Sequence, residues 1–259
     1  MNKKGNRRKQ IIKLLQMRNG VTIKELAGLF NVSEMTIRRD LQVLESENFV
    51  NLVHGAAIYN PQSNSDKMIK EYNLVSAKGK NNEAKNRIGK YAASLIESND
   101  HVIIDTGSTT EKIIPYVDIG KTFSLICYSS NIMMSAITKP NIDIFMGGGK
   151  YNPETSAFTS RYNVEYLKRI RATKFFASAS GVDLKYGVTC MHDYEIDVKS
   201  IAMQASLQNI LCVDSSKFGK VTNAYLGELS KFDLIISDKD LSQEWIDEIN
   251  KLKIELVLV

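Results

Sequence analysis

The first sixty residues place apolar side chains at the spacing of amphipathic helices. A first helix is predicted over residues 7–18. The capping box Thr22-x-x-Glu25 opens a second helix, and Ser33 is a suitable N-cap for a third helix that runs to about residue 47. The apolar stripes of the three helices are Ile11, Ile12, Leu14 and Leu15, then Leu26, Ala27, Leu29 and Phe30, then Ile37, Leu41 and Leu44.

Two short apolar runs, residues 49–53 and 56–59, follow on either side of His54-Gly55 and predict a β-hairpin. Three helices and a hairpin are the parts of a winged helix-turn-helix, which we expect over residues 1–59. Residues 60–81 are polar and contain few core-forming side chains. They predict a linker with a short helix around residues 68–74.

Beyond residue 81, short apolar runs are mostly separated by helical segments. This alternation predicts a largely parallel sheet with helices on its faces. The predicted fold class is α/β, with a Rossmann-like domain over residues 82–259. The predicted strands are His101–Asp105, Phe123–Cys127, Ile142–Met146, Phe175–Ala179, Ile210–Asp214, Leu234–Ser237 and Ile254–Val259, and a helix is predicted over Glu83–Glu97.

Composition narrows the class of protein. Of the 259 residues, 43% are apolar and 24% are charged, which is typical of a globular chain. Because no run of about 18 apolar residues and no signal-peptide pattern occurs, we expect a cytoplasmic protein without a membrane segment. The three cysteines are far apart, which argues against a disulfide framework and against a zinc ribbon.

The net charge of +5 lies entirely in the first quarter of the chain. Residues 1–60 hold ten Lys or Arg and five acidic residues, whereas the other 199 residues hold 24 of each kind. A basic segment on a neutral body favours contact with a polyanion such as double-stranded DNA, although a solvated basic face would give the same counts.

The third helix carries polar and basic side chains beside its apolar stripe. A hydroxyl and two guanidinium groups near a helix N-terminus suit a recognition helix that contacts base edges and phosphates. His54, at the predicted hairpin turn, is a candidate for a contact with the DNA backbone or else a solvated turn residue. The predicted DNA-binding residues are Ser33, Glu34, Met35, Thr36, Arg38, Arg39 and His54.

Candidate ligand chemistry in the C-terminal domain lies at the ends of the predicted strands. The tract from Asp105 to Thr110 follows one strand and precedes a predicted helix, so its backbone amides and hydroxyls suit a phosphate. The alternative is that the hydroxyls only cap the helix. Other polar or glycine-rich strand ends converge on the same edge and predict a binding crevice. These are Ser129-Ser130-Asn131, Gly147-Gly148-Gly149-Lys150, Gly181-Val182-Asp183 and Asp214-Ser215-Ser216-Lys217-Phe218.

The tract Ser33-x-x-Thr36-Ile37-Arg38-Arg39-Asp40-Leu41, with Arg7, Ile11 and Leu15, resembles the helix-turn-helix signature of the DeoR family of bacterial transcription regulators. The resemblance implies operator binding by the third helix and a structural role for Asp40, which pairs with a basic neighbour or fixes the helix. The wing departs from the family pattern. The family usually has an Arg ahead of Val-His-Gly-Gly, where this chain has Leu52-Val53-His54-Gly55-Ala56.

The resemblance continues through Asp105–Thr110, Gly147–Gly149, Gly181–Asp183 with Gly187–Thr189, and Asp214–Gly219, which look like the DeoR-family sensor domain. That domain is similar in fold to ribose-phosphate isomerase, glucosamine-phosphate isomerase and CoA-transferase enzymes. The resemblance implies a phosphorylated sugar or sugar alcohol as effector, with the phosphate on residues 106–110 near Lys199 and Lys217, and with Asp105 and Asp183 near the hydroxyls. The alternative for Lys199 is a solvated position on a helix. The segment Ala157–Arg161 replaces a Gly-Pro-like segment of many members.

The resulting prediction is a DNA-binding transcriptional regulator, a repressor of a carbohydrate operon that an effector releases from its operator. An attached DNA-binding domain favours sensing over the alternatives: an isomerase-like enzyme using Asp105, Asp183, His192, Asp193 or Glu195, a metal site at Cys190-x-His192-Asp193, or a purely structural DNA-binding protein. We expect a homo-oligomer (dimer or tetramer) with no cofactor, metal or catalytic residue. The predicted effector-binding residues are Asp105, Thr106, Gly107, Ser108, Thr109, Thr110, Ser130, Asn131, Gly148, Gly149, Gly181, Asp183, Lys199 and Lys217.

Overall fold

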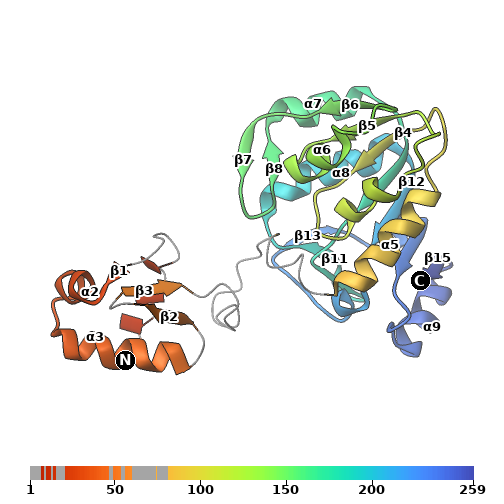
Figure 1. The fold of residues 1–259 in the computed structure, drawn as a ribbon. Coiled ribbons are helices and arrows are strands. Elements are labelled where there is room, and N and C mark those ends of the chain that lie inside the picture. The colour runs from red at the N-terminus through yellow and green to blue at the C-terminus, as the bar shows by residue number, and fades with distance from the viewer. Residues whose placement is uncertain are drawn as a thin grey trace. The chain divides into compact units, whose positions relative to one another are not determined.

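The computed structural model describes residues 7–8, 10–12, 14–15, 21–46, 49–53, 56–59, 74 and 81–259. The chain divides into two compact units, Met1–Glu71 and Tyr72–Val259 (Figure 1). The predicted linker over residues 60–81, with its short helix, lies outside the described residues except at its end and at Leu74, which is helical and buried. The proposed domain boundaries therefore stay a prediction.

The N-terminal unit is a small helical bundle with a three-stranded sheet. The described residues between 7 and 15 are helical and are followed by β1 (Val21–Thr22), α2 (Ile23–Phe30), α3 (Glu34–Ser46), β2 (Val50–Val53) and β3 (Ala56–Tyr59). Strands β2 and β3 pair antiparallel as the predicted hairpin, and the short strand β1, which the sequence did not predict, pairs with β3. The turn of the hairpin lies outside the described residues.

Local sequence explains the ends of these helices. Thr22 and Glu25 form the predicted capping box at the start of α2, and Asn31 ends that helix in the left-handed conformation that asparagine tolerates. Ser33 accepts a hydrogen bond from the backbone N–H of Thr36 at the start of α3. The core of the unit contains the predicted stripe of α3, but Leu29, predicted on the apolar face of α2, is 57% exposed.

A seven-stranded parallel sheet forms the centre of the C-terminal unit, in the order β15-β14-β12-β9-β4-β5-β6. All seven predicted strands belong to it, which confirms the α/β class. The bounds are β4 (His101–Ile104), β5 (Phe123–Cys127), β6 (Ile142–Met146), β9 (Ala172–Ala177), β12 (Ser206–Cys212), β14 (Leu234–Ser237) and β15 (Glu255–Leu258).

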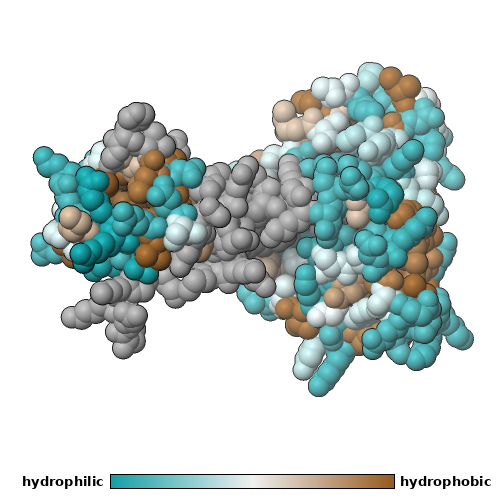
Figure 2. Space-filling view, turned by 60° about the horizontal axis from the view of Figure 1, so that its bottom comes forward, coloured by the Kyte–Doolittle hydropathy of each residue, from teal (hydrophilic) through white to brown (hydrophobic). Residues whose placement is uncertain are grey.

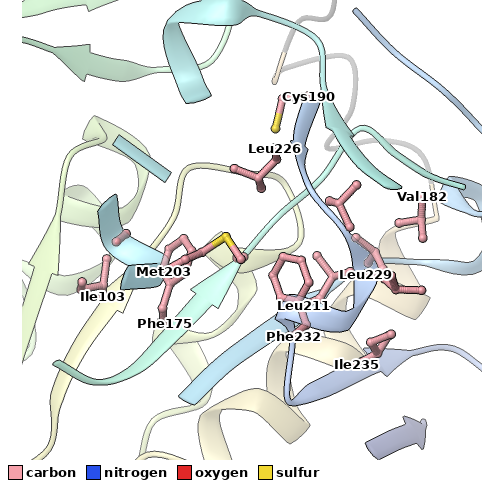
Figure 3. Packing of buried hydrophobic residues seen from close by; sticks show 14 of the residues in the cluster. Ile103, Phe175, Val182, Cys190, Met203, Leu211, Leu226, Leu229, Phe232 and Ile235 are labelled. Carbon is pink, nitrogen blue, oxygen red and sulfur yellow. The ribbon is translucent and has the colours of Figure 1, made fainter. Parts of the chain in front are cut away.

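Helices cover both faces of this sheet (Figure 1). Successive residues of a strand point to opposite faces, so Val102 and Ile104 of β4 pack with α5, whereas Ile103 packs on the side of α8. Figure 3 shows Phe175 of β9 next to Met203 of α8 in that second layer. The helices are α5 (Asn82–Ser94), α6 (Ser130–Ala136), α7 (Arg161–Arg169), α8 (Ile196–Ala205) and α9 (Gln243–Lys251).

Shorter elements complete the unit. Strands β10 (Gly181–Asp183), β11 (Gly187–Cys190) and β13 (Ala224–Gly227) form a small antiparallel sheet, and β7 (Lys150–Asn152) pairs with β8 (Ala157–Thr159). The 3₁₀ helices are η2 (Thr110–Lys112), η3 (Ile114–Tyr116), η4 (Asp193–Glu195), η5 (Ser215–Lys217) and η6 (Leu229–Lys231).

The surface of the C-terminal unit mixes polar and apolar residues on the face seen in Figure 2. Within the part of the chain that the structure describes, no helix has the length and apolar character that a membrane crossing requires.

Candidate functional site

The third helix of the N-terminal unit presents a polar, basic surface. Glu34, Met35, Arg38 and Arg39 are exposed on α3, and the Ser33 and Thr36 hydroxyls lie 2.9 Å apart at its start. Ile37 and Leu41 of the same helix are fully buried, so α3 is fixed on one face and free to contact DNA on the other. His54, the predicted wing contact, lies outside the described residues.

Asp40 anchors the first helix to α3. Its carboxylate is almost fully buried, and the guanidinium groups of Arg7 and Arg8 donate to it from 2.6 and 3.0 Å. This confirms the predicted structural role of Asp40 and gives its basic partners. The two arginines, Asp40 and Arg39 line a groove beside α3, together with Thr36, Gln42, Val43 and Ser46.

Replacing Asp40 with Asn should destabilise the N-terminal unit. The amide keeps the size of the side chain but loses the charge that two arginines hold, and a hydrogen bond to a charged group contributes about 1.5–3 kcal/mol. We expect the free energy of unfolding of this unit to fall by about 1–3 kcal/mol in urea denaturation, since the arginines remain partly solvated. Glu34→Gln, an exposed charge on the same helix, is the control. Equal stability of D40N and E34Q would contradict the anchoring role.

The C-terminal unit contains a pocket where the strand order reverses. The chain runs from β4 outward through β5 and β6 and then returns to β9 on the other side of β4. The connections that leave the neighbouring carboxyl ends of β4 and β9 therefore lead to opposite sides of the sheet, and parallel sheets bind ligands at such a point. The pocket is lined by Thr106, Gly107, Ser108 and Thr109 after β4, by Ser178, Ala179 and Ser180 after β9, and by Glu195, Lys199 and Lys217.

Close packing shapes the loop after β4. A Cβ at Gly107 would lie 2.7 Å from the Cβ of Ser178, so no larger residue fits without displacing the neighbouring strand end. The Thr110 hydroxyl donates to the carbonyl of Asp105 at 2.8 Å and closes the loop. The loop was predicted to precede a regular helix, but it is followed by η2, a 3₁₀ helix of three residues. A helix dipole therefore adds little here, and positive charge must come from side chains.

A buried charge network lies behind the pocket wall. Asp105 is fully buried, and its Oδ1 accepts from the Tyr128 hydroxyl at 2.7 Å. Its Oδ2 accepts from Lys199 at 2.7 Å and from the backbone N–H and hydroxyl of Ser178 at 2.9 and 2.8 Å. Both oxygens are thus engaged within the protein, so Asp105 supports the pocket from behind and does not line it.

Lys199 is not a solvated helix residue. Its side chain is 1% exposed, and its ammonium group also contacts Glu195 Oε2 at 3.2 Å and the carbonyl of Ser178 at 3.1 Å. Burial alone would lower the pKa of Lys199, but Asp105 and Glu195 outweigh it and raise the pKa well above its ordinary value. Lys199 is therefore a fixed cation and not a nucleophile.

A second group of lysines lies on the α5 side of the loop. Lys85 of α5 is 1% exposed, and burial lowers its pKa to about 8, an effect that Asp214 opposes and that Lys217 and Lys112 reinforce. Two close approaches hold this region together. A Cβ at Gly89 of α5 would lie 2.5 Å from the Cβ of Lys112, and Asn81 donates to Asp214 at 2.8 Å.

Several predicted effector residues lie away from this pocket. Ser130 and Asn131 begin α6, where Asn131 donates to Glu111, and Gly148 accepts from Ser160 beyond the edge strand β6. Asp183 accepts from two backbone N–H groups of its own hairpin turn. Gly149 (φ 136°) and Gly181 are sterically required, since added Cβ atoms would lie 2.3 Å from the carbonyl of Thr159 and 2.4 Å from that of Lys220. A direct role of these residues in binding stays a prediction.

Four residues of the pocket lining were not among the predicted binding residues: Ser178, Ala179, Ser180 and Glu195. Lys85, whose pKa is affected by Lys217 of the lining, was not predicted either. The serines follow a predicted strand, so the strand-end rule that selected residues 106–110 also applies to them. The spacing of Glu195 and Lys199, four residues apart on one helical face, was a further available signal. No sequence pattern around Lys85 indicates its position, because only the packing of α5 brings this residue near the loop.

Comparison with known proteins gives consistent matches along the chain. Residues 7–63 match the DeoR-like helix-turn-helix domain, and residues 80–239 match the DeoR C terminal sensor domain. The chain is 34% identical over 248 residues to the Deoxyribose operon repressor of Escherichia coli (strain K12), covering 96% of both proteins. It is 29% identical over 253 residues to the Lactose phosphotransferase system repressor of Lactococcus lactis subsp. lactis, covering 97% of both.

Among solved structures, ribose 5-phosphate isomerase A from Methanocaldococcus jannaschii aligns with 53% of this chain and with 55% of its own length. The sequence identity is 17% and the TM-score is 0.40. The chain thus spans about half the length of that enzyme.

Proposed function

This chain belongs to the DeoR family of transcriptional regulators, and on that premise we propose that it is a repressor that a phosphorylated sugar or sugar alcohol releases from its operator. It is a DNA-binding regulator and not an enzyme. The observation that carries the proposal is the pocket at the β4 and β9 ends, in the unit that follows the winged helix. The names of the relatives, repressors of sugar operons, support a carbohydrate uptake or catabolic operon as the target.

The chemistry of the pocket supports a phosphate as one part of the effector. Ser108 and Thr109 line it with hydroxyls that, among the described residues, no other protein group engages. Lys217 lines the same pocket, and Lys85 and Lys112 lie near it. Hydroxyl donors next to ammonium groups are the partners that a phosphate dianion needs when it leaves water.

We also propose that the working form is an oligomer in the cytoplasm, where operator DNA is found. A single winged helix makes few DNA contacts, and a second copy of the chain supplies a second one for the other half-site. Sedimentation of the full chain in the presence of operator checks the stoichiometry. A complex with one protein copy for each operator would contradict this part of the proposal.

The binding of phosphate compounds should weaken at alkaline pH. Burial lowers the pKa of Lys85 to about 8 in the free protein, so the charged fraction of this side chain falls as the pH rises through that value. A bound phosphate favours the protonated form, so binding takes up a proton near the free-state pKa and affinity falls as pH rises through about 8. Isothermal titration calorimetry between pH 7 and 9.5 with ribose 5-phosphate measures the trend, and K85Q should remove it. Identical pH profiles for the two proteins would contradict the role of Lys85.

A thermal-shift panel tests the proposed effector class. A ligand at about 100 times its dissociation constant adds roughly 2.7 kcal/mol to stability, which is a measurable shift. The panel contains sugar phosphates, polyol phosphates and the matching unphosphorylated sugars. We expect stabilisation by at least one phosphorylated compound and none by its unphosphorylated partner. Equal effects of the two partners would contradict a phosphate-binding pocket.

A further inference from the structure

The pocket at the β4 and β9 ends lies near charged side chains from both faces of the sheet. Lys85 lies on α5, which covers one face of the sheet, whereas Lys199 lies on α8, which covers the other (Figure 1). On the α5 side, Lys85 lies close enough to the ammonium groups of Lys112 and Lys217 and to the carboxylates of Glu111 and Asp214 for their charges to shift its pKa. On the α8 side, Lys199 lies between the carboxylates of Asp105 and Glu195, which leaves a net negative charge.

On the α8 side, the pocket offers hydrogen-bond acceptors to a ligand, whereas its charged donor, Lys199, is already engaged by protein groups. An ammonium group has three N–H donors, and those of Lys199 are directed to Asp105, Glu195 and Ser178, whose carbonyl and hydroxyl oxygens lie 3.1 and 3.3 Å away. Glu195 also lines the pocket, and its two oxygens provide about four acceptor positions. One oxygen contacts Lys199 at 3.2 Å and the other accepts the backbone N–H of His192 at 3.2 Å, so acceptor positions remain for a ligand.

We propose that Glu195 selects the chemical class of the effector. The pocket takes compounds that carry a phosphate at one end and neutral hydroxyls at the other, and it rejects phosphorylated sugar acids. Hydroxyl groups of the ligand donate to the Glu195 carboxylate, whereas a ligand carboxylate there faces a like charge with no free cation beside it. This inference rests on the proposed function, because it assumes that the phosphate binds near Ser108, Thr109 and Lys217.

A structural role of Glu195 is separable from this selection. Glu195 and His192 form the capping box at the start of η4. Glutamine accepts the same backbone hydrogen bond in a capping box as glutamate does. Glu195→Gln therefore keeps the cap and the contact with Lys199 while it removes the charge. Asp193→Asn is the matched control, because it removes the same charge two residues away, from an exposed side chain outside the pocket lining.

The test compares pairs of ligands that differ only at the end remote from the phosphate. Glucitol 6-phosphate is compared with 6-phosphogluconate, and ribitol 5-phosphate with 5-phosphoribonate, in calorimetric titrations of the full chain. Inorganic phosphate serves as a probe of the phosphate end alone. We expect the wild type to bind the neutral member of a pair about tenfold or more tightly than the acid. In E195Q this ratio should fall toward one, while D193N keeps the wild-type ratio, and inorganic phosphate should bind to all three proteins, to E195Q at least as tightly as to the wild type.

Each result has a definite meaning. Equal binding of the neutral and acidic members by the wild type, or an unchanged ratio in E195Q, would overturn the selection by Glu195 while leaving the phosphate site in place. If the wild type binds neither inorganic phosphate nor any of the phosphorylated compounds, the proposed phosphate site itself is wrong, and the selection falls with it. Melting temperatures of the three proteins establish that each is folded in the titrations.

Discussion

The double variant Ser108→Ala/Thr109→Ala is expected to bind its operator normally but to remain bound when the effector is added. Both hydroxyls line the pocket, and each donor to a charged acceptor contributes about 1.5–3 kcal/mol. Loss of both should weaken effector binding roughly a hundredfold to ten-thousandfold. The DNA-binding unit is unchanged, so operator affinity without effector should equal that of the wild type.

Operator affinity with and without the sugar phosphate, measured by fluorescence anisotropy, checks this outcome. Thr138→Ala/Ser230→Ala is the matched control, because it removes two hydroxyls from exposed positions outside the pocket. Gly107→Val gives an independent variant, since its side chain collides with Ser178. Release of the S108A/T109A protein at the same effector concentration as the wild type would place the phosphate elsewhere.

The second large effect is expected at the recognition helix. Arg38 and Arg39 are exposed on α3, whose opposite face is buried in the core of the unit. Each arginine that contacts a base contributes about 1–3 kcal/mol and specifies that position, whereas a phosphate contact weakens all sequences alike and lowers the salt dependence. Arg38→Ala/Arg39→Ala should therefore weaken operator binding by about 2–6 kcal/mol if both contact bases.

Gel-shift titrations at several salt concentrations distinguish these contributions. The control, Lys239→Ala/Lys251→Ala, removes the same charge from exposed positions in the sensor unit. Operator affinity equal to that of the control would contradict the assignment of α3 as the recognition helix.

The pattern of apolar residues along the chain was sufficient to predict most helices and strands of the fold. Continuous apolar runs predicted all seven strands of the parallel sheet, because a strand covered on both faces has little polar surface. The capping box at Thr22 and Glu25 predicted the start of α2 to the residue. The short strands β10, β11 and β13 were missed, since three or four residues give too little pattern to distinguish a strand from a loop.

The pocket was predicted in part, and the reason is topological. The strand-end rule found residues 106–109, but strand order is not written in any local pattern, so the meeting of β4 with β9 could not be predicted from spacing. Asp105 looked like a ligand-binding residue from its place after a strand, whereas burial and four hydrogen bonds make it a support for Lys199, Tyr128 and Ser178. Lys85 is near the pocket only through tertiary packing, so its proposed contribution to phosphate binding could not be predicted from the sequence.

In the proposed mechanism, a phosphorylated ligand in this pocket controls DNA binding by the other unit. The most direct measurement is the dissociation constant of the full chain for an operator selected from random duplexes, determined with and without the sugar phosphate that stabilises the protein. Because coupling between two sites is reciprocal, we expect the ligand to weaken operator binding and the operator to weaken ligand binding by the same factor, about tenfold or more. A ligand that binds the pocket yet leaves the operator dissociation constant unchanged would contradict control of DNA binding through this pocket.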